Sequence, residues 1–309
     1  MCTTVAKAVG GLYFGRNMDI EYSFGEELVF VPRGFPLDNK REGITDHFAF
    51  MGMGVVMEGY PMLAEGVNEF GLCMAGLNFK GYAAYYREEK GRINLAPYEL
   101  IPYILGKCRS LRDAVTALKR INLIAVPISK DIPLPALHFH IADKNGSLTY
   151  ETTAGGSKIY KNPVGVLTNN PEFNTHLTLL SGYENLKNQT PPPTFSTCPP
   201  YSLGLGAMGL LGDFSSVSRF TRAVFLKHYT PWERTSAIFD MYRILDSVAV
   251  PRGSVLTNDG KLHYTTYQIC IDADCLIYYC RPYGSINTFS VSMDSFGWEE
   301  RELREIKIK

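Results

Sequence analysis

A cysteine follows the initiator methionine of this 309-residue chain, and Arg16 and Asp19 follow in the same opening stretch, MCTTVAKAVGGLYFGRNMDIEYSF. Removal of the methionine would leave Cys2 with both a thiol and a free α-amine. The thiolate of such a residue can attack an amide carbonyl. Its amine has an ordinary pKa of about 7.7–8.0, against ~8.5 for a free thiol, so it can take the thiol proton near neutrality. Cys2 is therefore a candidate nucleophile that carries its own base.

Two charged side chains on the next predicted strand suit this chemistry. Asp19 can hold the α-amine, and a cation such as Arg16 near the sulfur favours the thiolate. A purely structural interpretation is also open, in which Cys2 is a small strand residue and Arg16 and Asp19 form an ion pair. Residue types alone do not choose between the two interpretations.

Short strands are predicted on both sides of these residues. Residues 3–9 and 12–18 are typical of a hairpin that turns at Gly10 and Gly11. Further strand patterns cover residues 28–34, 48–57, 71–79, 136–153 with a turn at 144–146, 157–170, 261–272, 275–283 and 285–293.

Strand blocks alternate with pairs of predicted helices, which cover residues 95–108, 110–121, 215–229 and 232–248. This order favours an α+β fold of layered antiparallel sheets with helices outside, over a doubly wound parallel sheet. No linker divides the chain, so a single domain over residues 1–309 is expected. Residues 181–213 are rich in Pro, Gly and polar residues and are predicted to form a long loop with a functional or assembly role.

The composition favours a globular protein without a nucleic-acid partner. Lys and Arg total 31 and Asp and Glu total 31, so the net charge is zero, and hydrophobic residues make up 45%. No stretch approaches the ~20 apolar residues of a membrane span, and no export segment is recognised. The seven scattered cysteines are expected to be reduced thiols in a cytoplasmic protein.

Four motifs occur in order along the chain: MCT with FGRNMDIEYSF, GVNEFGLCMAGLNF (66–79), GVLTNNPEF (165–173) and GDFSSVSRFTRAVF (212–225). Together they resemble the choloylglycine hydrolase family, which comprises bile salt hydrolases and penicillin V acylases. Weaker similarity extends across nearly the whole chain. The resemblance implies an N-terminal-nucleophile hydrolase with a four-layer αββα sandwich, no cofactor and no metal.

The resemblance also implies the catalytic residues, which are Cys2, Arg16, Asp19, Asn78, Asn169 and Arg219. Attack by the thiolate would create a tetrahedral oxyanion, which Asn169 and a donor at Asn78 could stabilise. Loss of one such donor typically costs about 2.7–4 kcal/mol. The SRF match selects Arg219 over Arg222, for which a solvated or scaffold role is expected. Asn170 is expected to be a turn residue.

The implied substrate is a bile salt conjugated to glycine or taurine. Asn78 is similar to the bile salt hydrolases, whereas penicillin V acylases often carry Tyr there, so penicillin V stays as an alternative substrate. A catalytically silent ligand-binding relative is an alternative of another class. Because the counterpart of residues 181–213 helps to build tetramers in related enzymes, a homo-oligomer, a tetramer, is expected. Residues that match the family's steroid-contacting loops, and that could instead be core or loop packing, are Met18, Met57, Ala64, Ile128 and Ile132.

Histidines and glycines suggest rival chemistries. Six histidines would allow a Cys–His hydrolase, but none falls inside the four motifs. His138 and His140 share one face of a predicted strand and could bind a metal, yet no third ligand accompanies them, so structural roles are expected. The GLGAMG stretch (204–209) matches GxGxxG without a preceding strand pattern, so no nucleotide is expected.

Overall fold

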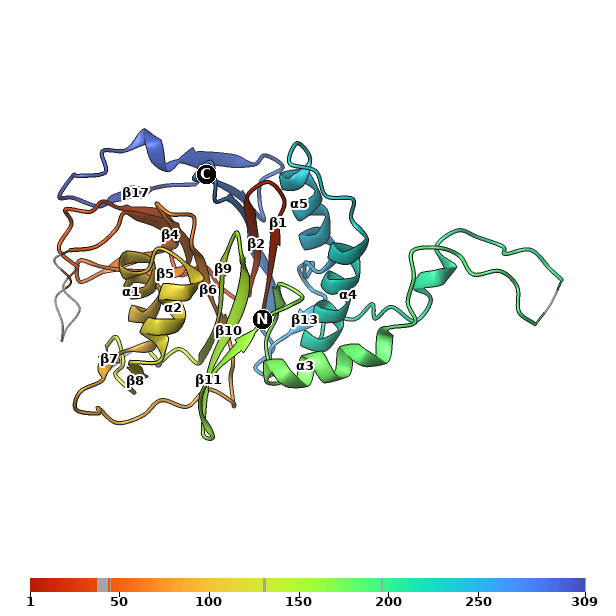
Figure 1. Cartoon of the computed structure of the whole chain (residues 1–309), viewed down its shortest axis with the longest axis horizontal. Helices are drawn as coiled ribbons and strands as arrows, with labels where there is room; N and C mark the ends of the chain where they lie inside the picture. The colour runs from red at the N-terminus through yellow and green to blue at the C-terminus, as the bar shows by residue number, and fades with distance from the viewer. Residues whose placement is uncertain (38–43, 45, 130–131, 196, 309) are drawn as a thin grey trace.

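Two antiparallel sheets face each other in the computed structural model of this chain, which describes residues 1–37, 44, 46–129, 132–195 and 197–308 (Figure 1). The first sheet has the strand order β12-β1-β2-β14-β15-β16, and β13 pairs with β14 at its side. Its strands are β1 (Cys2–Ala8), β2 (Leu12–Ile20), β12 (Val166–Leu167), β13 (Val255–Leu256), β14 (Leu262–Asp272), β15 (Ile277–Pro282) and β16 (Phe289–Ser292).

The second sheet has the strand order β11-β10-β9-β6-β5-β4-β3-β17. Its strands are β3 (Glu27–Val31), β4 (Phe50–Met57), β5 (Tyr60–Asn68), β6 (Cys73–Asn78), β9 (Leu137–Asp143), β10 (Gly146–Thr153), β11 (Gly156–Lys161) and β17 (Arg304–Ile306). A separate parallel pair is formed by β7 (Ile93–Leu95) and β8 (Ile121–Leu123).

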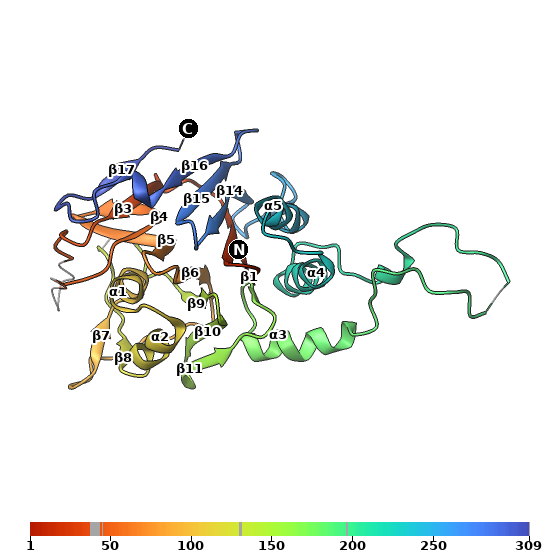
Figure 2. The same ribbon diagram turned by 45° about the horizontal axis from the view of Figure 1, so that its top comes forward.

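Helices cover the outer face of each sheet (Figures 1 and 2). The second sheet is covered by α1 (Leu100–Lys107) and α2 (Leu111–Leu118), and the first by α4 (Ser216–Tyr229) and α5 (Ala237–Ser247). A further helix, α3 (Phe173–Leu180), contacts α4. The predicted four-layer αββα sandwich is thereby confirmed. Short 3₁₀ helices are η1 (Pro97–Glu99), η2 (Ser181–Tyr183), η3 (Leu205–Ala207) and η4 (Met293–Ser295).

Two apolar clusters hold the layers together. The larger one joins the two sheets to α4 and α5 and includes Phe14, Met51 and Met241. The other lies between the second sheet and α1 and includes Phe139 and Ile104. Each fully buried side chain of this size stabilises the fold by about 1.5–3 kcal/mol relative to exposure. Because β1 and β2 contribute to the larger cluster, the segment that carries Cys2 is anchored on both faces.

One predicted helix begins at the wrong residue, and several elements were not predicted. The helix expected over 232–248, with Pro231 in its first turn, begins only at Ala237. The indole of Trp232 donates a 2.9 Å hydrogen bond to the carbonyl of Lys227, which folds this segment back onto the end of α4. The elements that the sequence patterns do not predict are β5, β7, β8, β13, β17 and α3, of which β5 and α3 follow turn-rich sequence.

Residues 181–213, which we call the arm, extend away from the sandwich (Figures 1 and 2). The backbone nitrogen of Lys187 donates a 2.9 Å hydrogen bond to the carbonyl of Gly206 and closes the base of the arm. Only the short helices η2 and η3 interrupt the described part of this predicted loop. Apolar side chains on the arm are exposed, namely Phe195, Tyr201, Leu203 and Met208.

Candidate active site

Cys2 is the first residue of β1 and pairs with Met18 of β2, while Thr4 pairs with Arg16. Successive strand residues point to opposite faces of a sheet, so Cys2, Arg16 and Met18 share the face that looks toward the second sheet. Thr3 points to the other face, where α4 lies. The chain start therefore stands where groups from both faces can reach it.

Arg16 approaches the thiol from the space between the sheets. Its Nη2 atom lies 3.4 Å from Sγ of Cys2 and donates a 2.8 Å hydrogen bond to the carbonyl of Gly76. Its Nη1 atom donates to the carbonyl of Ala64 at 2.6 Å and to the carboxylate of Glu65 at 2.5 Å. Arg16 is 1% exposed, so its charge acts on the thiol with little screening by solvent.

The charges around Cys2 favour its thiolate. Burial raises the pKa of the thiol, but Arg16 and the N-terminal ammonium lower it by more, so the pKa falls below its ordinary value. The thiolate is the nucleophilic form of cysteine. Cys2 thus meets the electrostatic requirement for a reactive thiol.

Arg219 of α4 approaches Cys2 from the opposite face. Its Nη1 atom donates hydrogen bonds to the carbonyl of Cys2 at 2.6 Å and to Oγ1 of Thr3 at 2.5 Å. Its Nη2 atom donates to Oδ1 of Asn169 at 2.7 Å. An ion pair of 3.6 Å joins Nη1 to Oδ2 of Asp19. Arg219 therefore fixes the backbone of the first strand residues and links two other predicted site residues.

Asn169 is buried directly beside Cys2, whereas Asn170 is exposed. The Oδ1 atom of Asn169 accepts a 2.8 Å hydrogen bond from the backbone nitrogen of Cys2, and the Nδ2 atom of Asn169 donates a 2.8 Å hydrogen bond to the carbonyl of Asn78. The side chain of Asn78 is exposed, and its Oδ1 atom accepts from the backbone nitrogen of Lys80. Asn78 thus enters the cluster through its backbone oxygen, a contact that sequence patterns do not predict.

Asp19 has one carboxylate oxygen that accepts no hydrogen bond but lies 3.6 Å from Arg219 Nη1. Its Oδ1 atom accepts a 2.6 Å hydrogen bond from Oγ1 of Thr265, while Oδ2 is buried without a hydrogen-bond partner. The ammonium of Met1 donates 2.7 Å to the carbonyl of Asp19 and lies 2.7 Å from Nε2 of His263. Burial lowers the pKa of this ammonium. The surroundings of the chain start therefore favour a neutral amine.

Three groups in this cluster were not predicted from the sequence: Glu65, Thr265 and His263. Glu65 of β5 contacts Arg16, Thr265 of β14 contacts Asp19, and His263 of β14 contacts the Met1 ammonium, each from a distant position in the chain. Glu65 immediately precedes one of the four motifs, and that position is its only sequence signal.

Of the predicted steroid-contacting residues, Met18 lies at the thiol and Ala64 lies at the neighbouring Arg16. Sδ of Met18 is 3.8 Å from Sγ of Cys2, and the carbonyl of Ala64 accepts from Arg16. The other three are half-buried: Met57 is the last residue of β4, and Ile128 and Ile132 lie in the loop that follows β8.

Both strand histidines are engaged inside the protein. His138 lies 3.0 Å from both the carboxylate of Glu151 and the carbonyl of Thr168, and Nδ1 of His140 lies 2.9 Å from Oγ1 of Thr4. In the described ranges, no group of three or more His, Cys, Asp or Glu residues could hold a metal. The histidine pair supports the sandwich.

Arg222 and the start of α4 serve the scaffold. Arg222 donates to the carbonyls of Leu211 and Ser247 at 2.5 and 2.8 Å. Oγ of Ser215 accepts from the backbone nitrogen of Ser218 and caps the helix. The expected scaffold role of Arg222 is confirmed.

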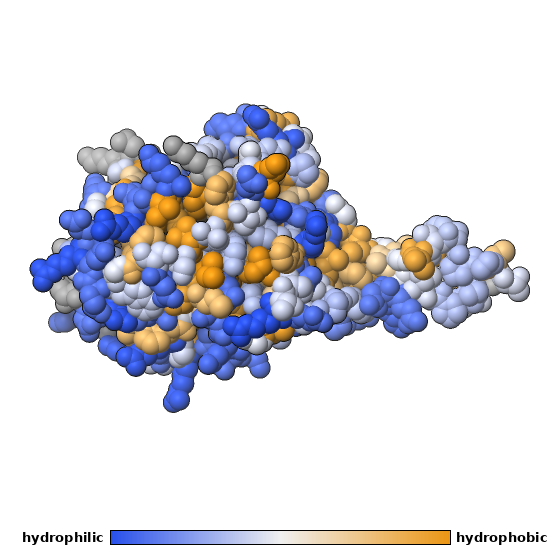
Figure 3. Space-filling view, turned by 90° about the horizontal axis from the view of Figure 1, so that it is seen from above, coloured by the Kyte–Doolittle hydropathy of each residue, from blue (hydrophilic) through white to orange (hydrophobic). Residues whose placement is uncertain are grey.

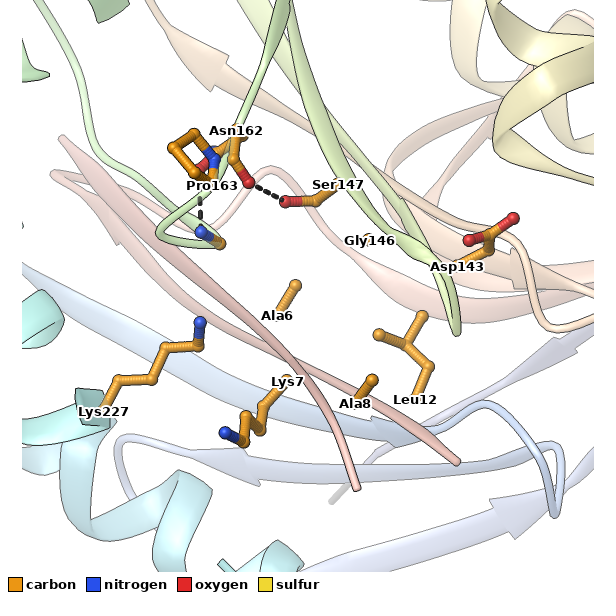
Figure 4. Close-up of a pocket in the computed structure, with 11 residues that line it drawn as sticks. Ala6, Lys7, Ala8, Leu12, Asp143, Gly146, Ser147, Asn162, Pro163 and Lys227 are labelled. Carbon is orange, nitrogen blue, oxygen red and sulfur yellow. Dashed lines mark hydrogen bonds between the residues drawn. The ribbon is translucent and has the colours of Figure 1, made fainter. Parts of the chain in front are cut away.

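A cavity of about 200 Å³ lies at the other end of β1 (Figure 4). Lys227 borders it and donates a 2.6 Å hydrogen bond to the carbonyl of Val164. Its lining includes Ala6, Lys7, Leu12 and Asn162 but none of the predicted catalytic residues. This cavity is separate from the cluster around the thiol.

Residues 2–304 match the family model described as linear amide C-N hydrolases, choloylglycine hydrolase family. The chain belongs to the choloylglycine hydrolase family. It is thereby an enzyme of the linear amide C–N hydrolase type, as the four ordered motifs predicted. No helix in the described part of this choloylglycine hydrolase family member is long and apolar enough to cross a membrane.

Curated relatives and solved structures agree with the family assignment. The chain is 40% identical to a bile salt hydrolase/transferase of Lactiplantibacillus plantarum, covering 98% of this chain and 95% of the relative. It is 36% identical to a bile salt hydrolase/transferase of Clostridium perfringens, covering 99% and 97%. The crystal structure of the C2A mutant of the conjugated bile acid hydrolase from Clostridium perfringens superposes with a TM-score of 0.94 at 34% identity, covering 100% and 97%. The penicillin V acylase from Agrobacterium tumefaciens shares the fold, with a TM-score of 0.77 at 21% identity, covering 99% and 90%.

Proposed function

We propose that this protein hydrolyses the amide bond of bile salts conjugated to glycine or taurine, through a thioester on Cys2, with the whole chain acting as one catalytic domain. The observation that carries the proposal is the pair of contacts made by Cys2. Nη2 of Arg16 lies 3.4 Å from its Sγ atom, and its backbone nitrogen donates a hydrogen bond to Asn169. The names of the curated relatives support the substrate class.

The first half of the reaction transfers the acyl group to the enzyme. Once Met1 is removed, the Cys2 thiolate attacks the amide carbon, and a C–S bond forms as the carbonyl electrons move to oxygen. The oxyanion collapses, the C–N bond breaks, and the departing nitrogen takes a proton from the Cys2 α-ammonium. Asn169 donates toward the oxyanion, and Oδ2 of Asp19, which also pairs with Arg219, holds the amine in place.

The second half releases the bile acid. The neutral α-amine accepts a proton from water, the resulting hydroxide adds to the thioester carbon, and the C–S bond breaks to restore the thiolate. An amino acid could replace water as the attacking nucleophile and would form a new conjugate. Entry of water to the thioester sets the balance between the two outcomes.

An apolar surface beside the thiol would receive the steroid. Met18 contacts Sγ of Cys2, and Ala64 belongs to the bulged stretch of β5 that receives Arg16. Met57, Ile128 and Ile132 extend this surface in the proposal. Methionine side chains adapt well to a flat, apolar ring system.

The test is release of glycine and taurine from a panel of bile conjugates, run in parallel with penicillin V. We expect conjugates to be cleaved and Cys2→Ser to abolish cleavage, while Cys275→Ser, which removes an exposed thiol, leaves it intact. Intact-mass measurement establishes whether Met1 is absent. A strong preference for penicillin V, full activity of Cys2→Ser, or no cleavage of any conjugate by the Met1-free protein would each refute the proposal.

We also propose that the enzyme forms a homotetramer through contacts of the arm. We further propose that it acts in the cytoplasm. Exposed Phe195, Tyr201 and Leu203 on an extended segment support assembly, since apolar side chains on such a segment gain stability when a partner covers them. Apolar residues are visible along the arm in Figure 3. Cys2, Cys73, Cys108, Cys270, Cys275 and Cys280 are free thiols, as suits a reducing compartment.

A further inference from the structure

Glu65 is a fully buried carboxylate on β5 of the second sheet, opposite the strand that carries Arg16. It receives three donors from the first sheet. Arg16 Nη1 lies 2.5 Å from Oε2, the Tyr278 hydroxyl lies 2.6 Å from Oε1, and the Tyr267 hydroxyl lies 3.2 and 3.3 Å from the two oxygens. Burial raises the pKa of both tyrosines, so they stay neutral donors.

A local irregularity of β5 brings Glu65 to this position. The pairing of β4 with β5 passes from Met53–Glu65 to Gly54–Leu63 and leaves Ala64 without a partner. Such a bulge re-aims neighbouring groups. Here it lets the carbonyl of Ala64 and the carboxylate of Glu65 both meet Nη1 of Arg16.

The guanidinium of Arg16 contacts two acidic groups, one at each of its terminal nitrogens. Its Nη1 end faces Glu65, and its Nη2 end faces the Cys2 thiol at 3.4 Å. A buried cation needs a compensating charge, and the Glu65 carboxylate is placed to supply one even when the thiol is protonated. Burial raises the pKa of Glu65, while the Arg16 guanidinium and the two tyrosine hydroxyls favour its ionised form. Among the described residues, only the thiolate would remain as an acidic group in hydrogen-bond range of the Arg16 guanidinium if Glu65 were absent.

We propose that Glu65, held by Tyr267 and Tyr278, is a positioning residue that anchors Arg16 across the gap between the sheets and limits how strongly Arg16 pairs with the Cys2 thiolate. The inference rests on Cys2 being the nucleophile of the proposed function. A thiolate in a tighter ion pair is a poorer nucleophile, because nucleophilicity falls as the thiol becomes more acidic. Glu65 therefore keeps Cys2 both ionised and reactive.

Two variants should change the strength of the pairing between Arg16 and the Cys2 thiolate in opposite directions. Glu65→Gln keeps the shape of the side chain and removes its charge, so Arg16 acts wholly on the thiolate. Tyr278→Phe removes one donor from Glu65, so the carboxylate draws Arg16 more strongly away from the thiolate. The other groups that face Cys2 stay in place, namely the terminal ammonium, Asp19 and Arg219.

The experiment measures the rate of alkylation of Cys2 by iodoacetamide against pH, with peptide mass spectrometry to isolate this thiol. Relative to the wild type, we expect the midpoint pH of Cys2 alkylation to fall by about 0.5–1 pH unit in Glu65→Gln and to rise in Tyr278→Phe. In Glu65→Gln, kcat on the best conjugate should fall about 3- to 10-fold with a smaller change in KM.

Glu69→Gln is the matched control, because Glu69 directly follows β5 and pairs with Arg33 but does not contact Arg16. The Glu69→Gln substitution should lower the stability of the protein without changing the midpoint pH of Cys2 alkylation. An unchanged midpoint in Glu65→Gln, or shifts of the same sign in the two variants, would overturn the inference whatever happens to stability. Alkylation needs no bile salt, so these outcomes differ from failure of the proposed function, which full activity of Cys2→Ser would reveal.

Discussion

The guanidinium of Arg219 and the carboxamide of Asn169 are joined by a 2.7 Å hydrogen bond, and both also hold the backbone of Cys2. This unit links α4 to the start of β1. It orients the thiol without touching the sulfur. Its geometry depends on the planar fork of an arginine, which presents several donors at fixed angles.

The Arg219→Lys variant should therefore lose stability and activity although it keeps the positive charge. A lysine nitrogen cannot reach the carbonyl of Cys2, Thr3 and Asn169 together, and loss of such hydrogen bonds lowers the free energy of unfolding by about 2 kcal/mol or more. We expect kcat to fall at least ~100-fold. Urea unfolding and amine release measure the two effects.

Arg222→Lys, three residues along the same helix, is the control for this prediction. Arg222 contacts carbonyls of Leu211 and Ser247 and none of the predicted catalytic groups. It should lower stability and leave kcat within about 3-fold, since no transition-state contact is lost. Equal losses of kcat in both variants would contradict a specific role for Arg219.

Arg16→Gln should raise the pKa of the Cys2 thiol. Arg16 is the largest influence that lowers this pKa, and burial, which raises it, would then dominate. The wild-type thiol should react with iodoacetamide at a pH below the ~8.5 midpoint of unfolded cysteines. The Arg16→Gln thiol should react only at higher pH. A wild-type midpoint at or above that of the urea-unfolded protein would contradict the assignment.

Stability should decline in acid because two histidines are buried. Burial lowers the pKa of His140 to about 3 and that of His176 to about 4. An unfolded histidine titrates near 6.5, so below that pH the unfolded chain binds protons that the folded chain refuses. Stability is therefore lost as the pH falls from 6.5 through these folded values, by several kcal/mol at order of magnitude.

Urea midpoints between pH 7 and pH 4 measure this decline. His176→Gln should flatten the pH dependence, although it also removes the 2.9 Å contact to the carbonyl of Asn169. Gln in place of exposed His228 should leave the slope unchanged. A His176→Gln protein with the wild-type slope would show that this residue does not carry the effect.

Removal of residues 190–203 should change assembly and leave the sandwich folded. The contact between Lys187 and Gly206 closes the arm at its base, so a short Gly-Ser link can replace the excised segment. We expect sedimentation to shift from a tetramer to a smaller species, with amine release per chain reduced less than about 10-fold. An unchanged tetramer would place the interface elsewhere.

Much of the sandwich could be predicted because its signals are local. The hairpin of β1 and β2, the turn between β9 and β10, and helix α4 all carry their own turn or capping residues. The start of α5 could not be predicted, since a tertiary contact of Trp232 displaces it. Strand β17 pairs with β3 across most of the chain, and no local pattern marks such a partner.

The predicted site residues were found through ordered motifs, and their contacts could not be. Sequence order does not reveal that Arg16 and Arg219 approach Cys2 from opposite faces of one sheet. Nor does it reveal that Asn78 contributes a backbone oxygen, or that Glu65 shares Arg16 with the thiol. These relationships depend on the register between strands and on the stacking of the two sheets.

The buried position of the Met1 ammonium, between the carbonyl of Asp19 and His263, has a practical consequence for producing the enzyme. An affinity tag fused ahead of Met1 would have to thread through this confined space, and it would leave Cys2 inside a continuous peptide. Recombinant protein should carry its tag after β17, at the outer edge of the second sheet, where added residues can extend into solvent.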